Sequence, residues 1–224
     1  MTFSIVGHCP RSGQYGVALS SSSPAVAARC AHARAGVGAV ATQNVSDPRL
    51  GPLGLDMLAR GDDAQTVVAR LEAKAGAHAA WRQVTVIDAG GGAAFSGAQA
   101  LGRNGHVIAP GAVAAGNMLA SDHVLPAMLD AFAAAPDAPL GERLVLALEA
   151  ALAAGGEEGP VHSAGLLVVA EQAWPLVDLR VDWAPAPIAD LRALWTLWQP
   201  QMYAYVTRAL DPAGAPSYGV PGDL

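Results

Sequence analysis

The sequence predicts an α+β fold in which two mainly antiparallel sheets pack together with helices outside them. Three observations predict it. Turn-rich segments join neighbouring extended segments, as they do between antiparallel strands. The order of strands, helices, strands and a final helix lacks the strand–helix alternation of parallel sheets. The small apolar residues at 36–41 fit a strand packed closely against another layer.

The first half of the chain is mostly short strands and turns. Strands are predicted at residues 2–8, 15–21, 25–28 and 36–43, and helices at 53–59 and 63–75. The turn at 10–13 makes the first two strands a hairpin. Val67, Val68 and Leu71 share one face of the second helix, and Asp62 or Asp63 caps its start.

The second half brings longer helices. Strands are predicted at 83–88, 93–96, 107–115, 164–170 and 174–181, and helices at 121–135, 140–154 and 187–210. A glycine turn at 89–92 joins the first two of these strands, and Pro200 kinks or splits the last helix. We therefore expect a single domain over residues 1–210 and an irregular Pro- and Gly-rich tail at 211–224.

Composition excludes several classes of protein. Hydrophobic residues are 52% of the chain and charged residues 14%, against about 25% in an average soluble domain, which excludes intrinsic disorder. A net charge of −6 without a basic cluster argues against nucleic-acid binding. No window of about 18 residues is apolar enough to span a membrane.

The N-terminal residues indicate where the protein is located, and that location indicates the redox state of its cysteines. Residues 1–8 lack the basic start and long apolar core of a signal peptide, so we expect a cytoplasmic protein. Cys9 and Cys30 are then free thiols. The histidines show no zinc-type spacing, so we expect no metal and no cofactor.

Several short motifs resemble the signature blocks of the DUF1028 family of bacterial and archaeal proteins. The blocks are TFSIV at 2–6, ARAGVGAVATQ at 33–43, GPLGLDML at 51–58, GNMLA at 116–120 and VDLRVD at 177–182. The hairpin turn at 10–13 matches as well, and the resemblance runs from residue 2 to about residue 194. It implies an Ntn-hydrolase-like fold, which is a four-layer αββα sandwich of two antiparallel sheets between helix layers.

Such a fold implies a nucleophile at the start of the chain. In an N-terminal-nucleophile (Ntn) hydrolase the first residue attacks a carbonyl, and its own α-amine serves as the base. Thr2 has the required hydroxyl and begins the first strand, and removal of Met1 would free its amine. With Met1 present, however, the Thr2 nitrogen lies in a peptide bond, and threonine is also an ordinary residue with which to begin a strand.

The expected partners of such a nucleophile are missing from the sequence. Proteasome-type sites use an acid near the end of the second strand and a lysine shortly after it. Here that region offers the serines at 20–23 and then His32 or Arg34. This absence favours a protein that has kept the sandwich and lost the catalytic residues.

A second candidate nucleophile is Cys30, which lies two residues before His32. Catalysis by a Cys–His pair requires the thiol and the imidazole within hydrogen-bond reach of each other. The alternative is that Cys30 is a buried thiol that packs as a small hydrophobic side chain.

Candidate substrate-binding residues are carboxamides at strand ends and charges on one strand. Gln43, Asn44 and Asn117 stand beside small residues at predicted strand ends, where their amides can bind a substrate or an oxyanion or satisfy turns. Arg34 is a further candidate. Asp178 and Arg180 alternate along a strand, so they form either a buried ion pair between strands or a ligand site at Arg180.

The last predicted helix carries a wide stripe of Leu, Trp and Met side chains between residues 191 and 202. Trp and Met are enriched at protein interfaces, so we expect a homo-oligomer formed through this helix. For function, the sequence favours a hydrolase of an amide bond in a small cytoplasmic metabolite, with Thr2 as nucleophile. The alternatives are a non-catalytic ligand-binding or assembly protein with the same sandwich, and a hydrolase that uses Cys30.

Overall fold

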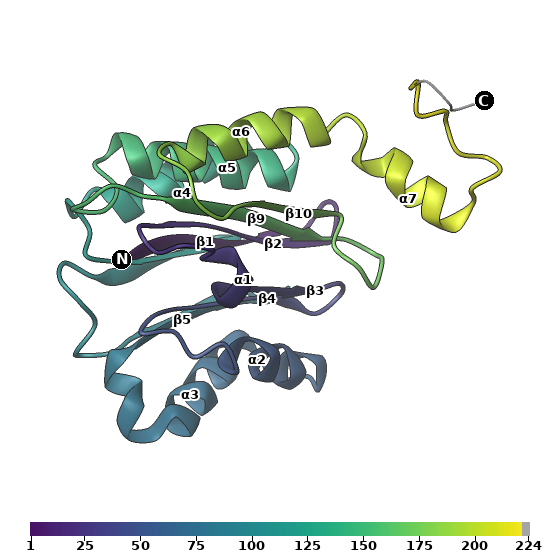
Figure 1. Cartoon of the computed structure of the whole chain (residues 1–224). Coiled ribbons are helices and arrows are strands. Elements are labelled where there is room, and N and C mark those ends of the chain that lie inside the picture. The colour runs from purple at the N-terminus through teal and green to yellow at the C-terminus, as the bar shows by residue number, and fades with distance from the viewer. Residues whose placement is uncertain (221–224) are drawn as a thin grey trace.

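The structure is a computed structural model that describes residues 1–220 and contains two antiparallel sheets between helices (Figure 1). The larger sheet has the order β10 (Val177–Val181), β9 (Ser163–Val169), β2 (Gln14–Ser21), β1 (Thr2–Cys9), β8 (Ala112–Asn117), β7 (Gly105–Ala109). The smaller sheet has the order β3 (Ala31–Arg34), β4 (Gly38–Asn44), β5 (Arg82–Ile87), β6 (Gly92–Ser96). Each neighbouring pair is antiparallel.

Helices cover the outer face of each sheet. The larger sheet is covered by α4 (Val124–Ala134), α5 (Leu140–Ala153) and α6 (Pro187–Trp198), and the smaller one by α2 (Leu50–Ala59) and α3 (Ala64–Ala75). A short helix, α1 (Ala27–Cys30), precedes β3, and a 3₁₀ helix, η1 (Gly76–Trp81), precedes β5. These layers are the αββα arrangement that the family resemblance implied, so the predicted fold class is confirmed.

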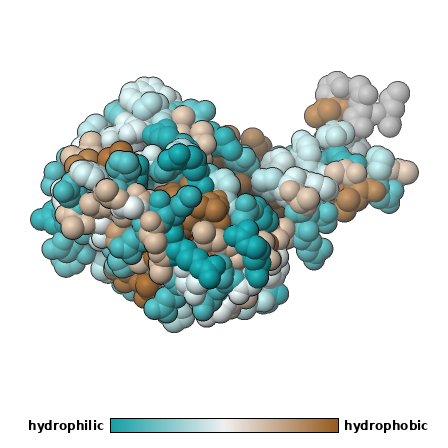
Figure 2. Space-filling model, turned by 90° about the horizontal axis from the view of Figure 1, so that it is seen from below, coloured by the Kyte–Doolittle hydropathy of each residue, from teal (hydrophilic) through white to brown (hydrophobic). Residues whose placement is uncertain are grey.

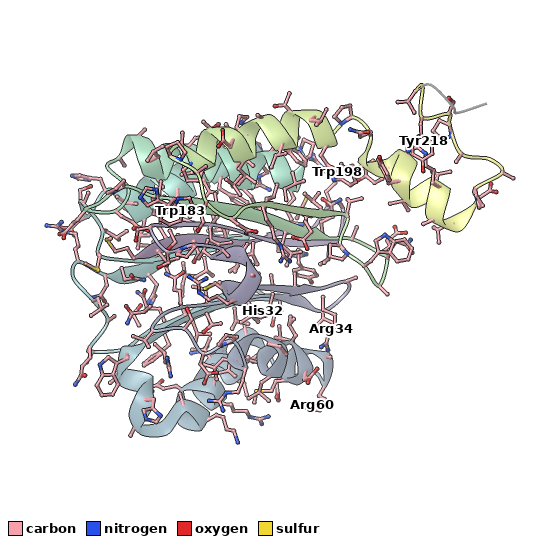
Figure 3. All side chains as sticks on the ribbon, in the orientation of Figure 1. His32, Arg34, Arg60, Trp183, Trp198 and Tyr218 are labelled. Carbon is pink, nitrogen blue, oxygen red and sulfur yellow. The ribbon has the colours of Figure 1, made fainter. Side chains whose placement is uncertain are left out.

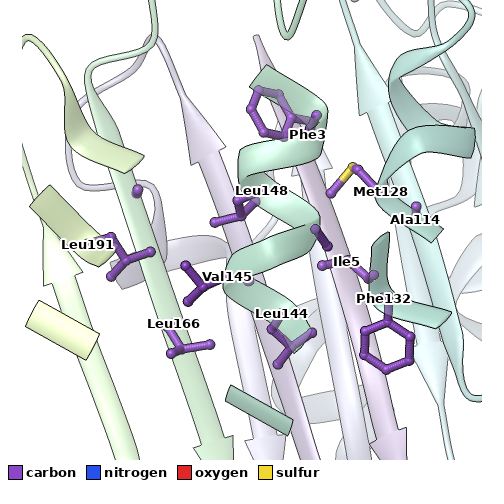
Figure 4. Close-up of a cluster of buried hydrophobic side chains, with 14 of the residues drawn as sticks. Phe3, Ile5, Ala114, Met128, Phe132, Leu144, Val145, Leu148, Leu166 and Leu191 are labelled. Carbon is purple, nitrogen blue, oxygen red and sulfur yellow. The ribbon is translucent and has the colours of Figure 1, made fainter. Parts of the chain in front are cut away.

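The largest apolar cluster lies between the larger sheet and its helices. Phe3 and Ile5 alternate along β1 so that both side chains face α4 and α5, where they pack with Phe132, Leu144 and Leu148 (Figure 4). Each of these side chains is at most 2% exposed. Burial of one such side chain contributes about 1.5–3 kcal/mol to stability, so this cluster holds the larger sheet and its helices together.

The outer face of the smaller sheet packs on α2 and α3 in the same way. Val40, Val84 and Val86 lie with Leu71 of α3 in a separate apolar cluster. The side chain of Asp63 accepts a hydrogen bond of 2.7 Å from the backbone N–H of Thr66, which confirms the predicted cap of this helix.

The inner faces of the two sheets meet in an inter-sheet layer. Because strand side chains alternate, one face of each strand points into this layer and the other toward the helices. Over part of its length the layer is apolar, and its buried residues there are Val6, Val17, Leu19, Ala39, Ile87 and Val113. We call this part the apolar end.

The structure corrects three predicted elements. Residues 25–28, predicted as a strand, lead into α1, and β3 follows directly, which the prediction lacked. The single strand predicted at 107–115 is the hairpin of β7 and β8, which turns at Pro110 and Gly111, whose φ is +75°. The helix at 53–59 begins three residues earlier, at Leu50.

The C-terminal segment leaves the body of the molecule. As predicted, the long helix is interrupted near Pro200, because α6 ends at Trp198 and α7 runs over Met202–Leu210. Figures 1 and 2 show α7 projecting away from the sheets. Residues 211–220 form no helix or strand, and the last four residues of the predicted tail lie outside the described residues. None of the described helices is both long and apolar enough to cross a membrane.

Candidate functional site

The inter-sheet layer becomes polar where β1 begins. There the inward-facing side chains are Thr2, Ser4, Ser21, Gln43, Gln83 and Asn117, which we call the polar end. They come from five strands of both sheets, and each is at most 6% exposed. Buried polar groups are costly unless they are hydrogen-bonded, so such a concentration needs an explanation.

A chain of hydrogen bonds joins the two sheets at the polar end. The Ser4 hydroxyl donates to Oε1 of Gln43 at 2.6 Å, and Nε2 of Gln43 donates to Oε1 of Gln83 at 3.3 Å. Nδ2 of Asn117 donates to the same oxygen of Gln83 at 2.9 Å. Nε2 of Gln83 in turn donates to the Gly116 carbonyl at 2.9 Å.

One acceptor in this network has no partner. Oδ1 of Asn117 is buried and accepts no hydrogen bond from any described residue. An unpaired buried polar atom costs about 1–3 kcal/mol, so a native one is a reason to look for a ligand or a catalytic role. Nδ2 of Asn117 bonds Gln83, and its Oδ1 is the acceptor that Asn117 offers to a ligand.

Thr2 lies beside this free acceptor. It opens β1, a central strand of the larger sheet, and pairs with Asn117 of β8, so their side chains share a face. Its hydroxyl lies 3.2 Å from the Ser21 hydroxyl and also reaches the Met1 carbonyl. The Ser21 hydroxyl donates to that carbonyl as well. The Met1 carbonyl therefore lies against both hydroxyls.

A buried acid completes the surroundings of the N-terminus. Glu157, in the loop between α5 and β9, is 4% exposed. Its Oε2 accepts a hydrogen bond of 3.2 Å from the backbone N–H of Ser22, and its Oε1 has no partner among the described residues. Burial raises the pKa of Glu157 to about 7, against the opposing effects of the N-terminal ammonium and the Ser22 hydrogen bond.

The structure brings together three of the residues that the sequence singled out. Thr2, Gln43 and Asn117 all belong to the polar end. Asn44, the neighbour of Gln43, does not. Its φ is +73°, and its side chain bonds the Trp81 carbonyl and the Leu101 N–H, so it satisfies a turn.

Cys30 and His32 do not form the predicted pair. The Cys30 thiol faces the inter-sheet layer, where its sulfur lies 3.3 Å from the Ser46 hydroxyl. The His32 ring packs against Gly51 of α2, on the other side of β3 (Figure 3). Burial raises the pKa of the Cys30 thiol and lowers that of His32, and both shifts work against a thiolate–imidazolium pair.

The charged candidates lie away from the polar end. Arg34 forms an ion pair with Asp56 of α2, at the end of β3 opposite to Gln43 in the sheet register (Figure 3). Asp178 and Arg180 bond each other at 2.8 Å along the edge strand β10, with side chains 38% and 44% exposed. The expectation of a buried pair that links two strands is therefore wrong, because the pair lies on one edge strand with both side chains partly in solvent.

Four residues of the site were missed. Ser4 could have been found, because it shares a strand face with Thr2. Ser21 ends the strand predicted at 15–21, and Gln83 begins a predicted strand. For Glu157 the sequence holds no signal, since only the fold brings its loop to the end of β2. Within residues 1–220, no three His, Cys, Asp or Glu side chains are grouped to hold a metal ion.

Comparison with known proteins gives the family. A family model described as a family of unknown function (DUF1028) matches residues 2–191. A DUF1028 protein of Silicibacter pomeroyi, known from a crystal structure, is 32% identical with a TM-score of 0.83 over 92% of this chain and 93% of that chain. No curated protein matches the chain.

Two more distant structures resemble the chain weakly. BPH of Thiobacillus denitrificans, in complex with epoxomicin, is 15% identical with a TM-score of 0.42 over 77% of this chain and 100% of that one. Anbu (ancestral beta-subunit) from Yersinia bercovieri is 14% identical with a TM-score of 0.39 over 91% and 97%. Neither similarity is close enough to carry an argument about this site. The match over residues 2–191 and the Silicibacter relative do identify the chain: it belongs to the DUF1028 family.

Proposed function

We propose that the protein hydrolyses an amide bond in a small cytoplasmic metabolite, with Thr2 as nucleophile once Met1 is removed. The observation that carries the proposal is the placement of Thr2. It begins a central strand, its hydroxyl contacts Ser21, and the free Oδ1 of Asn117 lies on the same buried face. A strand residue with a purely structural role has no need of an unpaired buried acceptor beside it.

The chemistry follows from these groups. Oγ of Thr2 attacks the amide carbonyl carbon, its proton passes to the α-amine of Thr2, and the carbonyl π electrons move onto the oxygen. When the tetrahedral intermediate collapses, the C–N bond breaks and the α-ammonium gives its proton to the departing nitrogen. An ester on Thr2 remains, and water cleaves it with the same amine as base. Oδ1 of Asn117 accepts a hydrogen bond from the substrate N–H.

The test compares variants of the chain that begins at Thr2. A panel of small primary and secondary amides is screened for release of ammonia or amine. We expect turnover by the wild type, a fall of at least about 10³-fold in Thr2→Ala, and retained turnover in Thr2→Ser. Cys30→Ala is the matched control and should leave the rate unchanged. Equal rates in Thr2→Ala and wild type would overturn the proposal.

One observation favours the second candidate, an assembly protein. The projecting helix α7 exposes large apolar side chains, with Tyr203 57% and Leu210 60% exposed. A cavity of about 310 Å³ between α7 and the body, lined in part by Gln14, Trp174 and Tyr203, offers space for a ligand. The predicted interface stripe at 191–202 packs largely into the core, where Leu191, Trp195 and Met202 are buried. We therefore propose that α7 docks on a second copy of the chain. Sedimentation should show an oligomer that Tyr203→Ser with Leu210→Ser converts to monomer; a wild-type monomer at micromolar concentration would contradict it.

A further inference from the structure

Glu157 is a buried acid for which the fold of the sandwich gives no structural reason. It sits in the loop after α5, and its backbone pairs with Leu119 just beyond the end of β8. One carboxyl oxygen accepts the Ser22 N–H, and the other has no partner among the described residues. Removal of a carboxylate from water without a cation to pair it is costly, so its retention here calls for a cationic partner.

The neighbours of Glu157 show which cation that is. Ser22 holds the carboxyl one residue from Ser21, and the Ser21 hydroxyl contacts both Thr2 and the Met1 carbonyl. The Met1 side chain reaches the same loop, because a Cβ placed on Gly159 would lie 3.4 Å from its Cε. The N-terminal ammonium, which belongs to Met1 in this structure, opposes the burial effect on the pKa of Glu157, whereas the adjacent Glu158 is exposed.

We infer that Glu157 is the positioning residue for the α-amine of Thr2, whose ammonium it holds beside the Thr2 hydroxyl once Met1 is gone. This inference rests on the proposed function for its purpose. The free Oε1 accepts an N–H hydrogen bond from the amine, while Ser22 keeps the carboxyl in place. The acid that the sequence lacks near the end of the second strand is thus supplied by a loop more than a hundred residues away in the chain.

Positioning by a carboxylate has a measurable signature. A negative charge within hydrogen-bond distance favours the ammonium form and raises its pKa by about 1–3 units. Glutamine has the same shape without the charge, so Glu157→Gln should lower the apparent pKa of the Thr2 amine by at least about one unit, a tenfold change in the amine–ammonium ratio. Glu158→Gln changes a neighbouring exposed acid and is the matched control.

The experiment is competitive acetylation of the chain that begins at Thr2. The protein is treated with trace acetic anhydride between about pH 5 and pH 10, and acetylation of the N-terminal peptide is measured by mass spectrometry. The inference predicts a lower amine pKa in Glu157→Gln, an unchanged one in Glu158→Gln, and partial recovery in Glu157→Asp. Superimposable titration curves for the wild type and Glu157→Gln would overturn it. If Glu157→Gln does not fold, Glu157→Ala takes its place, because it also removes the charge and a wild-type curve there would overturn the inference.

The outcome is separable from that of the proposed function. A shifted amine pKa without any amide hydrolysis would leave Glu157 as the partner of the N-terminus and remove the catalytic proposal. Hydrolysis that depends on Thr2, together with an amine pKa that is unchanged in Glu157→Gln, would keep the catalytic proposal and remove this inference.

Discussion

The two ends of the inter-sheet layer are built from the same strands and the same strand faces, yet their chemistry differs. Along β1 the inward side chains change from Thr2 and Ser4 to Val6 within five residues, and along β2 from Ser21 to Leu19. The apolar end joins the sheets through burial alone. The polar end joins them through hydrogen bonds between carboxamides and a serine, and it leaves an acceptor of Asn117 unpaired. The neighbouring Glu157 has an unpaired acceptor as well.

This difference distinguishes the residues that stabilise the sandwich from those that we expect to carry its function. Burial at the apolar end contributes about 25 cal/mol per Å² of apolar surface and needs no polar partner. The polar end gains little net stability from its bonds and bears the cost of its unpaired atoms. Proteins break their own packing rules mainly at functional sites, so the polar end is where we place function. Four substitutions or pH changes test this division.

The largest effect is expected from Leu19→Ala at the apolar end. It deletes most of a fully buried side chain and leaves a cavity, so the free energy of unfolding should fall by about 2–5 kcal/mol. The acetylation titration of the Thr2 amine should not change, because Leu19 is not part of the polar end. Urea unfolding measures the loss, and Leu148→Ala in the helix-side cluster should cost a similar amount. A change in the Thr2 titration would break the division.

The next effect is a dependence of the free energy of unfolding on pH, which comes from Glu157 beside the polar end. In the chain that retains Met1, burial raises the pKa of Glu157 to about 7 from 4.5, so the folded chain binds a proton that the unfolded chain has released. The stability from this protonated carboxyl is complete below about pH 4.5 and is lost as pH rises through 7. The loss is on the order of 3 kcal/mol at 1.36 kcal/mol per pKa unit. Urea unfolding at several pH values should show it in the wild type and in Leu19→Ala, but not in Glu157→Gln. Parallel slopes for wild type and Glu157→Gln would contradict it.

A smaller effect is expected from Gln83→Leu. Gln83 accepts from Gln43 and Asn117 and donates to the Gly116 carbonyl, so leucine leaves those groups without their partner. Packing of the leucine offsets part of the cost, and we expect a net loss of about 2 kcal/mol. Thermal unfolding measures it. Increased stability would show that the hydrogen-bond network is dispensable.

The smallest effect is expected from Thr85→Val, which lies on β5 two residues from Gln83 and on the same face of the strand. The Thr85 hydroxyl is buried and has no partner among the described residues. Thr85→Val keeps the shape and removes the unpaired hydroxyl, so it should be neutral or stabilising by up to about 1 kcal/mol. It is the matched control for Gln83→Leu. A loss of stability as large as in Gln83→Leu would mean that the cost depends on the position in the strand and not on the hydrogen bonds that are removed.

Much of this architecture was predictable from local pattern, and part of the site was too. Alternation in residues 2–8 and 15–21 gave the first hairpin. The strand-end carboxamides Gln43 and Asn117 both bond Gln83, and Asn117 pairs with Thr2. The α1–β3 segment was missed because its two elements are only four residues long each, too short for a periodic pattern. The β7–β8 hairpin was missed although Pro110–Gly111 is a turn signal.

The remaining residues of the site depend on tertiary structure. Glu157 reaches Ser22 because its loop returns from α5 to the start of β9 beside β2, and no local pattern contains that information. Asp178 and Arg180 were placed on one strand face correctly, but only the sheet order shows that β10 is an edge strand. Cys30 and His32 are close in sequence, but the chain turns from helix to strand between them.

The most direct test of the central claim is the intact mass of untagged protein expressed with its natural start. We predict a mass lower by one methionine residue, which leaves the Thr2 amine free beside its hydroxyl and Glu157. Full retention of Met1 would contradict it, because the amine that the mechanism uses as a base would remain in a peptide bond.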